Sequence, residues 1–317
     1  MPVLNRHFLL AHINISSTPF TILLMMRHLK KIVFIGWGLA SNVWAIDLLP
    51  GDVVAPKPGI NLLQFTYQRS ERGDYYKNNA VLVPNKELVN TQLQVKYGRS
   101  FEIQDLPAFF YLQTPYTDIK ATGNAVSLLG LSDASGVGDT TFALAIWPYA
   151  NHNTRRYLGV AGYLTAPTGD YQNQRAVNPG ENRYKWAGQI GYQQPVYKDL
   201  DWMVAFDTLW FGKNSDYKVG GYSTLEQKPL YSLQTSVLYQ LNHTYAATLA
   251  YFYSSGAVSY KDNARQSDQT VSQRYQASLI ANVPMGKVIL QYGQEISTKS
   301  GFKEESRWLL RYNRYFK

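Results

Sequence analysis

The chain has 317 residues, a formal net charge of +9 and no cysteine. The missing cysteine excludes a disulfide framework, a thiolate metal site, a cysteine nucleophile and a lipidated N-terminal cysteine. Mean hydropathy is only −0.28, and beyond residue 45 no run approaches the ~20 apolar residues of a membrane helix. A membrane protein of this composition must alternate apolar and polar faces, although a soluble β-protein would show the same averages.

The first 45 residues are typical of a targeting segment. A short basic stretch at residues 26–31 precedes an apolar stretch at residues 32–39 and a small-x-small site that ends at Ala45. This order predicts a secretory signal that is cleaved after Ala45, whereas the apolar stretch is too short for the alternative, a single membrane anchor. The residues before Met25 fit no part of a signal, so we expect translation to start at Met25 or Met26. Residues 1–45 then comprise an upstream segment plus a signal peptide.

Cleavage would also lower the net charge to +5, because residues 1–45 carry four basic side chains and no acid. No basic run in the remainder resembles a nucleic-acid patch, so we expect no nucleic-acid partner. Residues 46–59, which follow, contain three prolines and two glycines. They are therefore predicted to form neither a central strand nor a helix.

From residue 60 to the end, apolar and polar residues alternate in successive segments. In residues 228–240, for example, Leu233 and its neighbours two positions away face opposite to Gln234. This period of two indicates strands with one apolar face. Residues 101–115 are the exception, because part of that segment is apolar on both faces. We expect twelve strands, at residues 60–68, 87–98, 101–115, 137–148, 155–165, 184–194, 200–211, 228–240, 243–254, 270–283, 286–297 and 304–316.

The connections between these segments alternate in length along the chain. Bacterial outer-membrane barrels have an even number of strands, short periplasmic turns and longer outer loops, whereas a soluble sandwich has no reason to sort its loops in this way. Residues 60–317 are therefore predicted to form an all-β, transmembrane, antiparallel up-and-down β-barrel of about 12 strands in the outer membrane of a Gram-negative bacterium. The expected long connections are 69–86, 116–136, 166–183, 212–227 and 255–269, and the short ones are 99–100, 149–154, 195–199, 241–242 and 284–285.

Aromatic residues mark the two edges of the predicted membrane band. Eight strand residues, tilted by about 40°, rise roughly 20 Å, which is close to the height of the apolar band between the aromatic girdles of such barrels. The last strand ends in an aromatic residue next to the C-terminus, a pattern expected to engage the barrel-assembly machinery. Outer-membrane lipid is the other expected partner. Aromatic pairs at this spacing are Tyr184/Tyr192, Trp202/Trp210, Tyr231/Tyr239, Tyr245/Tyr253 and Trp308/Phe316.

Four short motifs occur in a fixed order, namely Leu48-Leu49-Pro50-Gly51-Asp52, Gly136-Val137-Gly138-Asp139, Pro167-Thr168-Gly169-Asp170-Tyr171 and Asn178-Pro179-Gly180. In this order and spacing they resemble the meta-pathway phenol-degradation family of outer-membrane transporters. The resemblance covers essentially all of the chain after residue 45. It implies an outer-membrane barrel that serves passive uptake of small hydrophobic or aromatic compounds.

Two of these motifs have competing structural and functional interpretations. Residues 136–139 resemble a phosphate loop, but a strand pattern follows them in place of a helix, so a tight loop is expected. Residues 167–170 end a predicted strand and indicate a turn. The functional alternative is that the loop folds into the lumen as a constriction, for which the candidate residues are Pro167, Thr168, Gly169, Asp170, Asn178 and Arg183.

An outer-membrane hydrolase is a second alternative function. Beyond residue 45 the only histidines are His152 and His243, and both fall in or beside predicted periplasmic turns. They do not have metal-ligand spacing, and the sequence contains no Gly-x-Ser-x-Gly elbow. We therefore expect no enzymatic activity, no catalytic or metal residues and no cofactor.

The lumen face is where a transport function would reside. Its predicted residues are mostly neutral, and the few charges are of both signs, which does not indicate strong ion selectivity. The alternative is that these polar groups bond to one another and only fill a non-conducting, structural or surface-interaction barrel. Lumen-lining candidates are Gln92, Gln94, Lys96, Tyr157, Tyr163, Gln189, Asp207, Gln234, Phe252, Arg274, Gln276, Gln291, Glu295 and Arg311.

A twelve-stranded barrel is wider than the eight-stranded barrels that side chains fill and narrower than the open porins. A narrow, obstructed passage is therefore expected. Residues 46–59 cannot pair as a strand and are tethered to the first strand at the periplasmic mouth, so they are a candidate plug.

Overall fold

The computed structural model describes residues 46–49, 51–84, 86–127 and 130–317. The predicted start codon, the signal peptide and the cleavage after Ala45 lie outside these residues and stay predictions, as does any role of Pro50. Among the described residues, no helix is both long enough and apolar enough to cross a membrane.

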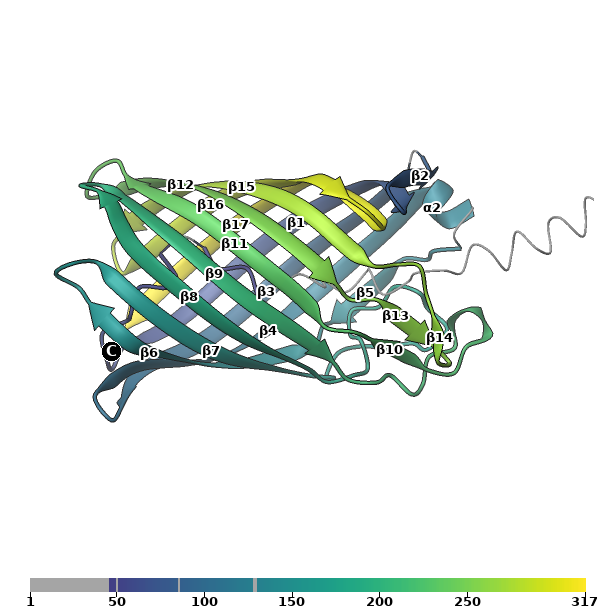
Figure 1. Ribbon diagram of the computed structural model, residues 1–317, viewed down its shortest axis with the longest axis horizontal. Coiled ribbons are helices and arrows are strands. Elements are labelled where there is room, and N and C mark those ends of the chain that lie inside the picture. The colour runs from purple at the N-terminus through teal and green to yellow at the C-terminus, as the bar shows by residue number, and fades with distance from the viewer. Residues whose placement is uncertain (1–45, 50, 85, 128–129) are drawn as a thin grey trace, which may run out of the picture. The chain divides into compact units, whose positions relative to one another are not determined.

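Twelve long antiparallel strands form a closed barrel (Figure 1). Each strand pairs with its neighbours along the chain, and the last strand pairs with the first from Asn61↔Phe316 to Tyr76↔Gly301. The prediction of a twelve-stranded up-and-down barrel is therefore confirmed. Its strands are β1 (Asn61–Lys77), β3 (Lys86–Ile103), β4 (Leu106–Gly123), β6 (Thr140–Asn151), β7 (Arg156–Ala166), β8 (Lys185–Tyr197), β9 (Leu200–Phe211), β11 (Leu230–Gln240), β12 (Tyr245–Gly256), β15 (Thr270–Val283), β16 (Gly286–Thr298) and β17 (Gly301–Phe316).

The two ends of the barrel differ (Figure 1). One end carries tight turns and the C-terminus, whereas shorter elements gather at the other end. This asymmetry identifies the turn end as periplasmic and the loop end as external. The shorter elements are β2 (Ala80–Val83), α2 (Asn124–Ser127), β5 (Ala134–Val137), η1 (Val219–Gly221), β10 (Leu225–Gln227), β13 (Ser259–Lys261) and β14 (Ala264–Arg265).

Several predicted boundaries near the N-terminus were wrong. The first periplasmic turn lies at Gln104 and Asp105, with φ of 48° and 64°, and not at residues 99–100. Two consecutive residues of positive φ are the signature of the two-residue turn that matches strand twist. Strands β1 and β4 continue to Lys77 and Gly123, into segments predicted to be loops. These extensions lie beyond the apolar band, so their outer faces need no apolar residues and the sequence shows little alternation.

Strand β4 tolerates two prolines in a continuous sheet. Pro115 lies where the pairing of β4 passes from β6, which it follows up to Gln113, to β5, which it follows from Tyr116. The ladder is already interrupted there, so the missing N–H of Pro115 breaks no regular bond. This local feature explains why the strand was hard to recognise from sequence.

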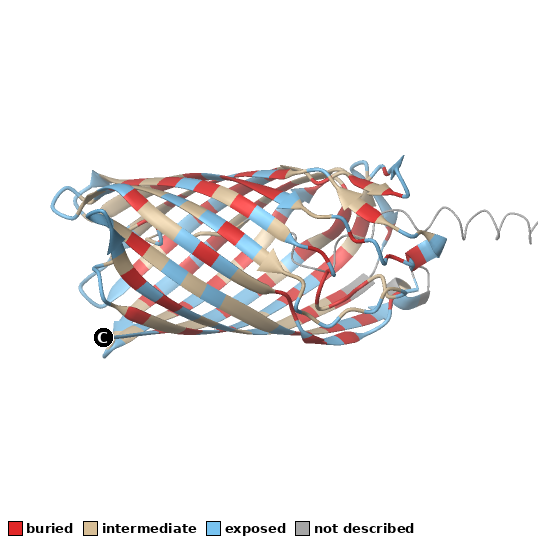
Figure 2. Ribbon diagram, turned by 90° about the horizontal axis from the view of Figure 1, so that it is seen from below, coloured by how far each residue is buried: buried red, intermediate tan, exposed pale blue. Residues whose placement is uncertain are grey.

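The two faces of the barrel wall alternate residue by residue (Figure 2). On β11, Leu233 is 47% exposed whereas the next residue, Gln234, is 2% exposed. The ten aromatic residues of the eight-residue pairs are all exposed or partly exposed. The outer surface is thus the apolar, aromatic-edged face that lipid requires, and the polar face is turned inward.

A charge placed in the middle of this outer face tests the assignment. Leu249 is exposed and lies midway between Tyr245 and Tyr253 on β12. We expect Leu249→Arg to lower the free energy of unfolding in phospholipid vesicles by about 2–4 kcal/mol, because a lipid-facing arginine at mid-membrane costs that much.

The matched control is Leu241→Arg, which changes an exposed leucine in the turn that precedes β12. There the expected loss is about 0–1 kcal/mol, since the interface tolerates charge. Equal losses in urea titrations of the two variants would contradict the lipid-facing assignment.

Candidate functional site

The barrel interior holds all fourteen lumen candidates and divides them into two groups. Eight are buried and are not part of the lining of the cavity described next, namely Tyr157, Asp207, Gln234, Phe252, Arg274, Gln276, Gln291 and Glu295. The other six line a cavity of about 420 Å³, namely Gln92, Gln94, Lys96, Tyr163, Gln189 and Arg311. Members of the first group, such as Gln234, Arg274 and Tyr157, contact an inner segment of the chain. Gln189 of the second group contacts the same segment and also lines the cavity.

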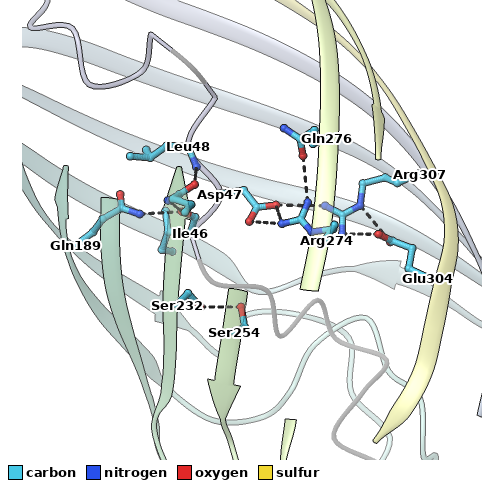
Figure 3. A network of polar contacts seen from close by, with 11 residues as sticks. Ile46, Asp47, Leu48, Gln189, Ser232, Ser254, Arg274, Gln276, Glu304 and Arg307 are labelled. Atoms are coloured by element: carbon cyan, nitrogen blue, oxygen red, sulfur yellow. Dashed lines mark hydrogen bonds and ion pairs between the residues drawn. The ribbon is translucent and has the colours of Figure 1, made fainter. Parts of the chain in front are cut away.

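The inner segment consists of residues 46–49 and 51–59, and its first residues lie between opposite walls of the barrel (Figure 3). The Ile46 carbonyl oxygen accepts hydrogen bonds from the side-chain nitrogens of Gln189 at 2.8 Å and Gln234 at 3.1 Å. The Leu48 N–H donates to the Gln234 Oε1 at 3.1 Å. Because these donors and acceptors are main-chain atoms, they hold an extended strand-like segment without any special side chain.

Asp47 is the charged anchor of the segment (Figure 3). Its carboxylate accepts from the Arg274 guanidinium at 2.7 Å to both oxygens, and from Arg307 at 3.3 Å. Arg307 in turn pairs with Glu304 at 2.9 Å, and the Arg274 guanidinium lies 4.0 Å from the centre of the Phe252 ring. Both arginines are almost fully buried. Buried charges of this kind persist only when they are paired and hydrogen-bonded.

Apolar contacts fix the rest of the segment. Val53 and Ala55 pack in one cluster with Trp147 and Met203, and the indole N–H of Trp147 donates to the Val53 carbonyl oxygen at 2.7 Å. At the periplasmic mouth, the Gly59 N–H donates to the Ser100 carbonyl oxygen at 2.9 Å. The segment therefore runs from the middle of the lumen back to the start of β1.

The cavity lies beside this segment, against the wall made by β1, β3, β4, β6, β7, β8 and β17. Phe109 and Tyr111 on β4 contribute aromatic rings to its lining, and the ammonium group of Lys96 lies 4.1 Å from the centre of the Tyr111 ring. The doubly apolar stretch of β4 is thereby explained, because one face contacts lipid while the other lines the cavity. The cavity is mixed in character, with aromatic, amide and basic groups together.

The outer rim unites three of the four sequence motifs. The two oxygens of Asp139 accept from the Gly169 N–H at 3.0 Å and the Glu181 N–H at 2.9 Å. Reciprocally, Asp170 accepts from the Val137 N–H at 2.8 Å. Burial raises the pKa of Asp139, and the two N–H bonds oppose that change. The aspartates of these motifs therefore hold the loops of the outer rim together by accepting main-chain hydrogen bonds.

Close packing explains the glycines of the same motifs. A Cβ at Gly136 would meet the Asp170 carboxylate at 2.2 Å, and one at Gly180 would meet Asp139 at 2.8 Å. A Cβ at Gly169 would meet the main chain of Gly138 at 2.7 Å. No side chain larger than hydrogen fits at these crossings. The glycines of the motifs are therefore required by the close packing of the loops.

The loop 167–184 contributes to the cavity mouth. Of the six constriction candidates, Asn178 lines the cavity, whereas Pro167, Thr168, Gly169 and Asp170 form the fastened rim and Arg183 is buried. Glu181 also lines the cavity. Asn178 and Glu181 therefore bring part of this loop to the lining of the cavity.

A buried ion cluster holds the end of this loop. Glu181 pairs with Lys185 and, through Nε of Arg183 at 2.9 Å, with that guanidinium. Burial alone would raise the pKa of Glu181, but Lys185 and Arg183 bring the pKa down to about 2. Arg183 also lies 4.7 Å from the centre of the Phe211 ring. The two cations thus favour the charged form of Glu181, and the ion pairs join the end of the loop to the start of β8.

Several charged residues of the interior were missed from the sequence, among them Asp47, Arg307 and Glu304. Asp47 lies in the candidate plug, but no pattern predicts which residues it contacts. Arg307 shares the inward phase that was assigned to Arg311, so the same alternation could have found it. Glu304 is inward because β1 pairs with Ser306 and then with Glu304, which leaves Glu305 as a bulge that reverses the phase.

Neither histidine lies near the cavity. His152, in the turn after β6, contacts the Tyr157 hydroxyl at 3.1 Å. The main-chain oxygen of His243, in the turn before β12, accepts from Asn282 at 3.1 Å.

A closed antiparallel barrel with a lipid-facing outer surface and a hollow, partly polar interior defines an outer-membrane channel. Comparisons with known proteins agree. Residues 77–310 match the family described as "Putative MetA-pathway of phenol degradation", and the chain belongs to that family. No curated protein sequence matches the chain.

Solved structures that are similar to this chain include an outer membrane channel and the beta domain of an autotransporter. The COG4313 outer membrane channel from Pseudomonas putida F1 shares 26% sequence identity with a TM-score of 0.80, over 85% of this chain and 100% of that chain. The beta domain of the Bordetella autotransporter BrkA shares 10% identity with a TM-score of 0.52, over 82% of this chain and 100% of that chain, which is a likeness of fold alone. The outer-membrane location and the channel class follow from the fold, the family and the first of these structures.

The fastened rim makes a specific prediction. An Asp139→Asn substitution replaces one acceptor oxygen by an amide NH₂ group, which cannot accept a hydrogen bond from a main-chain N–H. The variant therefore loses a charge-assisted bond worth about 1.5–3 kcal/mol. We expect trypsin to cleave the loop after Arg175 about tenfold faster or more in the variant than in the native barrel embedded in vesicles.

The matched control is Asp262→Asn, which removes the carboxylate that caps Ser223 and Thr224 in a different outer loop. Cleavage after Arg175 should be unchanged in this control. Equal cleavage rates in both variants would show that Asp139 does not hold the loop.

Proposed function

We propose that the protein mediates passive uptake of small hydrophobic or aromatic compounds across the outer membrane. The observation that carries the proposal is the cavity of about 420 Å³ inside the barrel. Its lining includes Asp139 and Glu181 at the outer rim and Leu62 and Tyr315 near the periplasmic mouth. A solute of one aromatic ring fits within such a volume.

The chemistry of the lining supports this class of solute. Aromatic rings of Phe109, Tyr111 and Tyr163 alternate with the amides of Gln92 and Gln94 around the space. Aromatic side chains stack on a ring, while amides bind a hydroxyl or carbonyl group. The family description names phenol degradation, which agrees with an aromatic solute.

One bulky side chain should be enough to block passage of a solute through the cavity. Ala161 lines the cavity, whereas the next residue, Gly162, faces outward with no atom near the position of a Cβ. We expect Ala161→Trp to reduce uptake of benzyl alcohol to the level of cells without the protein, measured in Gram-negative cells with an intact outer membrane. Gly162→Trp places the same side chain toward lipid and should retain native uptake.

Failure of the native protein to raise uptake at all would favour the alternative, a non-conducting structural or surface-interaction barrel. Equal uptake by the two tryptophan variants would show that solutes do not pass through this cavity. In both variants, folding is checked by the heat-dependent shift in gel mobility that closed barrels show.

We also propose that residues 46–59 plug the lumen. Their contacts with Gln189, Gln234 and Arg274 support a segment that fills one side of the barrel. Deletion of Asp47 to Pro58 should raise single-channel conductance in planar bilayers, and unchanged conductance would contradict the plug. Asp47→Asn keeps the main-chain contacts but loses the ion pairs, so we expect more frequent openings without a larger minimum conductance.

A further inference from the structure

Most charges that face the interior are paired with a partner of opposite sign. Arg274 and Arg307 pair with Asp47 on the inner segment. At the outer rim, Lys185 pairs with Glu181. The opposite charges within these pairs largely cancel, so the pairs contribute little net charge to the space that a solute would occupy.

Two basic residues differ from this pattern. Lys96 on β3 and Arg311 on β17 flank β1 at one level, since Lys96 is in register with Gln64 and Arg311 with Thr66. Both line the cavity. Within the described residues, no carboxylate lies within ion-pair distance of either side chain. Their contacts are neutral: Arg311 Nε donates to the Thr66 hydroxyl at 3.3 Å, and Lys96 lies over the ring of Tyr111.

One acidic residue is near enough for its charge to act on both. This is Asp52, on the inner segment, whose carboxylate accepts the Leu49 N–H at 2.9 Å. Asp47 also acts on Arg311, but its charge is already shared by Arg274 and Arg307. Two cations with a single further anion, Asp52, leave an excess positive charge on this wall. Like charges held together in a partly dry space repel, and an added anion relieves that repulsion.

We propose that Lys96 and Arg311 bind the carboxylate of a monoaromatic acid, whose ring lies against Phe109 and Tyr111. Guanidinium and ammonium groups are the natural partners of a carboxylate, and the neighbouring rings supply the apolar half of the site. The inference rests on the proposed function, because it names the class of aromatic solute that this channel selects.

The test is the reversal potential of the native protein in planar bilayers under a potassium benzoate gradient. We expect benzoate to permeate better than potassium. In the double variant Lys96→Gln/Arg311→Gln, the permeability ratio should fall about tenfold, the change that about 1.4 kcal/mol of lost attraction produces. Benzamide, the neutral isostere, should interrupt the potassium chloride current more weakly than benzoate in the native protein, and equally weakly in the variant.

The matched control is Lys287→Gln/Arg314→Gln, which removes the same two charges from exposed positions near the periplasmic end. It should keep the native ratio. A native channel that conducts but does not prefer benzoate, or a double variant with the native ratio, would overturn the anion site while leaving the channel intact. No current from the folded native protein would instead overturn the proposed function.

A second inference concerns a buried carboxylate that makes no hydrogen bond of normal geometry with the described part of the chain. Asp207 on β9 is 0% exposed, and both of its oxygens lack a hydrogen bond of normal geometry. The groups around it include the Ile46 main-chain nitrogen, the Asp47 carboxylate and the side chains of its cross-strand neighbours, Gln189 and Ser232. Gln189 is itself occupied, since it donates to the Ile46 carbonyl oxygen and accepts from the Tyr163 hydroxyl at 2.7 Å.

We infer that the mature chain begins at Ile46 and that its α-ammonium group pairs with Asp207 inside the barrel. Water adds across the Ala45–Ile46 peptide bond during signal cleavage, so that Ala45 gains a carboxylate and Ile46 gains an ammonium group. A peptide amide at this position would offer one N–H and no charge. The ammonium group offers a positive charge and additional N–H donors. It thereby compensates a buried charge that would otherwise be costly.

N-terminal sequencing of the protein purified from outer membranes should begin at Ile46. In the folded native protein, an amine-reactive label at about pH 7, which favours α-amines over lysines, should leave Ile46 unmodified. Asp207→Asn should lose this protection, Asp207→Glu should retain it, and Asp201→Asn on the same strand should behave as native. A different first residue, or equal labelling of native protein and Asp207→Asn, would overturn the inference.

Discussion

The closure of the sheet is the constraint on which the rest of the structure depends. Lipid offers no hydrogen bonds to the main chain, so every strand in the membrane must pair on both sides, and the first strand must meet the last. Pairing of β1 with β17 achieves this. Once the sheet is closed, alternation sends every second side chain inward, and the apolar outer face leaves the polar residues to the interior. The chemistry of the lumen is therefore a consequence of the wall.

An interior full of polar groups then needs partners. The inner segment supplies many of them: its main-chain atoms satisfy Gln189 and Gln234, and Asp47 balances two buried arginines. These contacts occupy one side of the lumen and leave the cavity on the other. Stability and passage are thus linked, because the same segment that compensates the buried charges sets how much space remains.

The sequence predicts the strands of the barrel wall better than the contacts made inside the barrel. Period-two alternation identified most of the twelve strands because lipid imposes it residue by residue, as at Leu233 and Gln234, whereas residues 101–115 are partly apolar on both faces and show it poorly. It failed where lipid ends, on the outer extension of β1, and where a bulge at Glu305 reversed the phase. The sequence indicated a plug at residues 46–59 but not which side chains Asp47 would meet, since its contacts with Arg274 and Arg307 join residues more than 200 positions apart. Long-range pairing of that kind leaves no periodic trace.

The recognisable motifs and the residues proposed to bind a solute lie in different parts of the barrel. The glycines and aspartates of residues 136–139 and 167–170 fasten loops at the rim, where close main-chain crossings permit only those residues. Lys96 and Arg311, which belong to no motif, line the cavity with a charge that no described side chain pairs. Recognition of the family therefore rests on the parts that hold the mouth in shape. The residues proposed to bind a solute are, by contrast, single inward positions, and these can change without altering the pattern that identifies the fold.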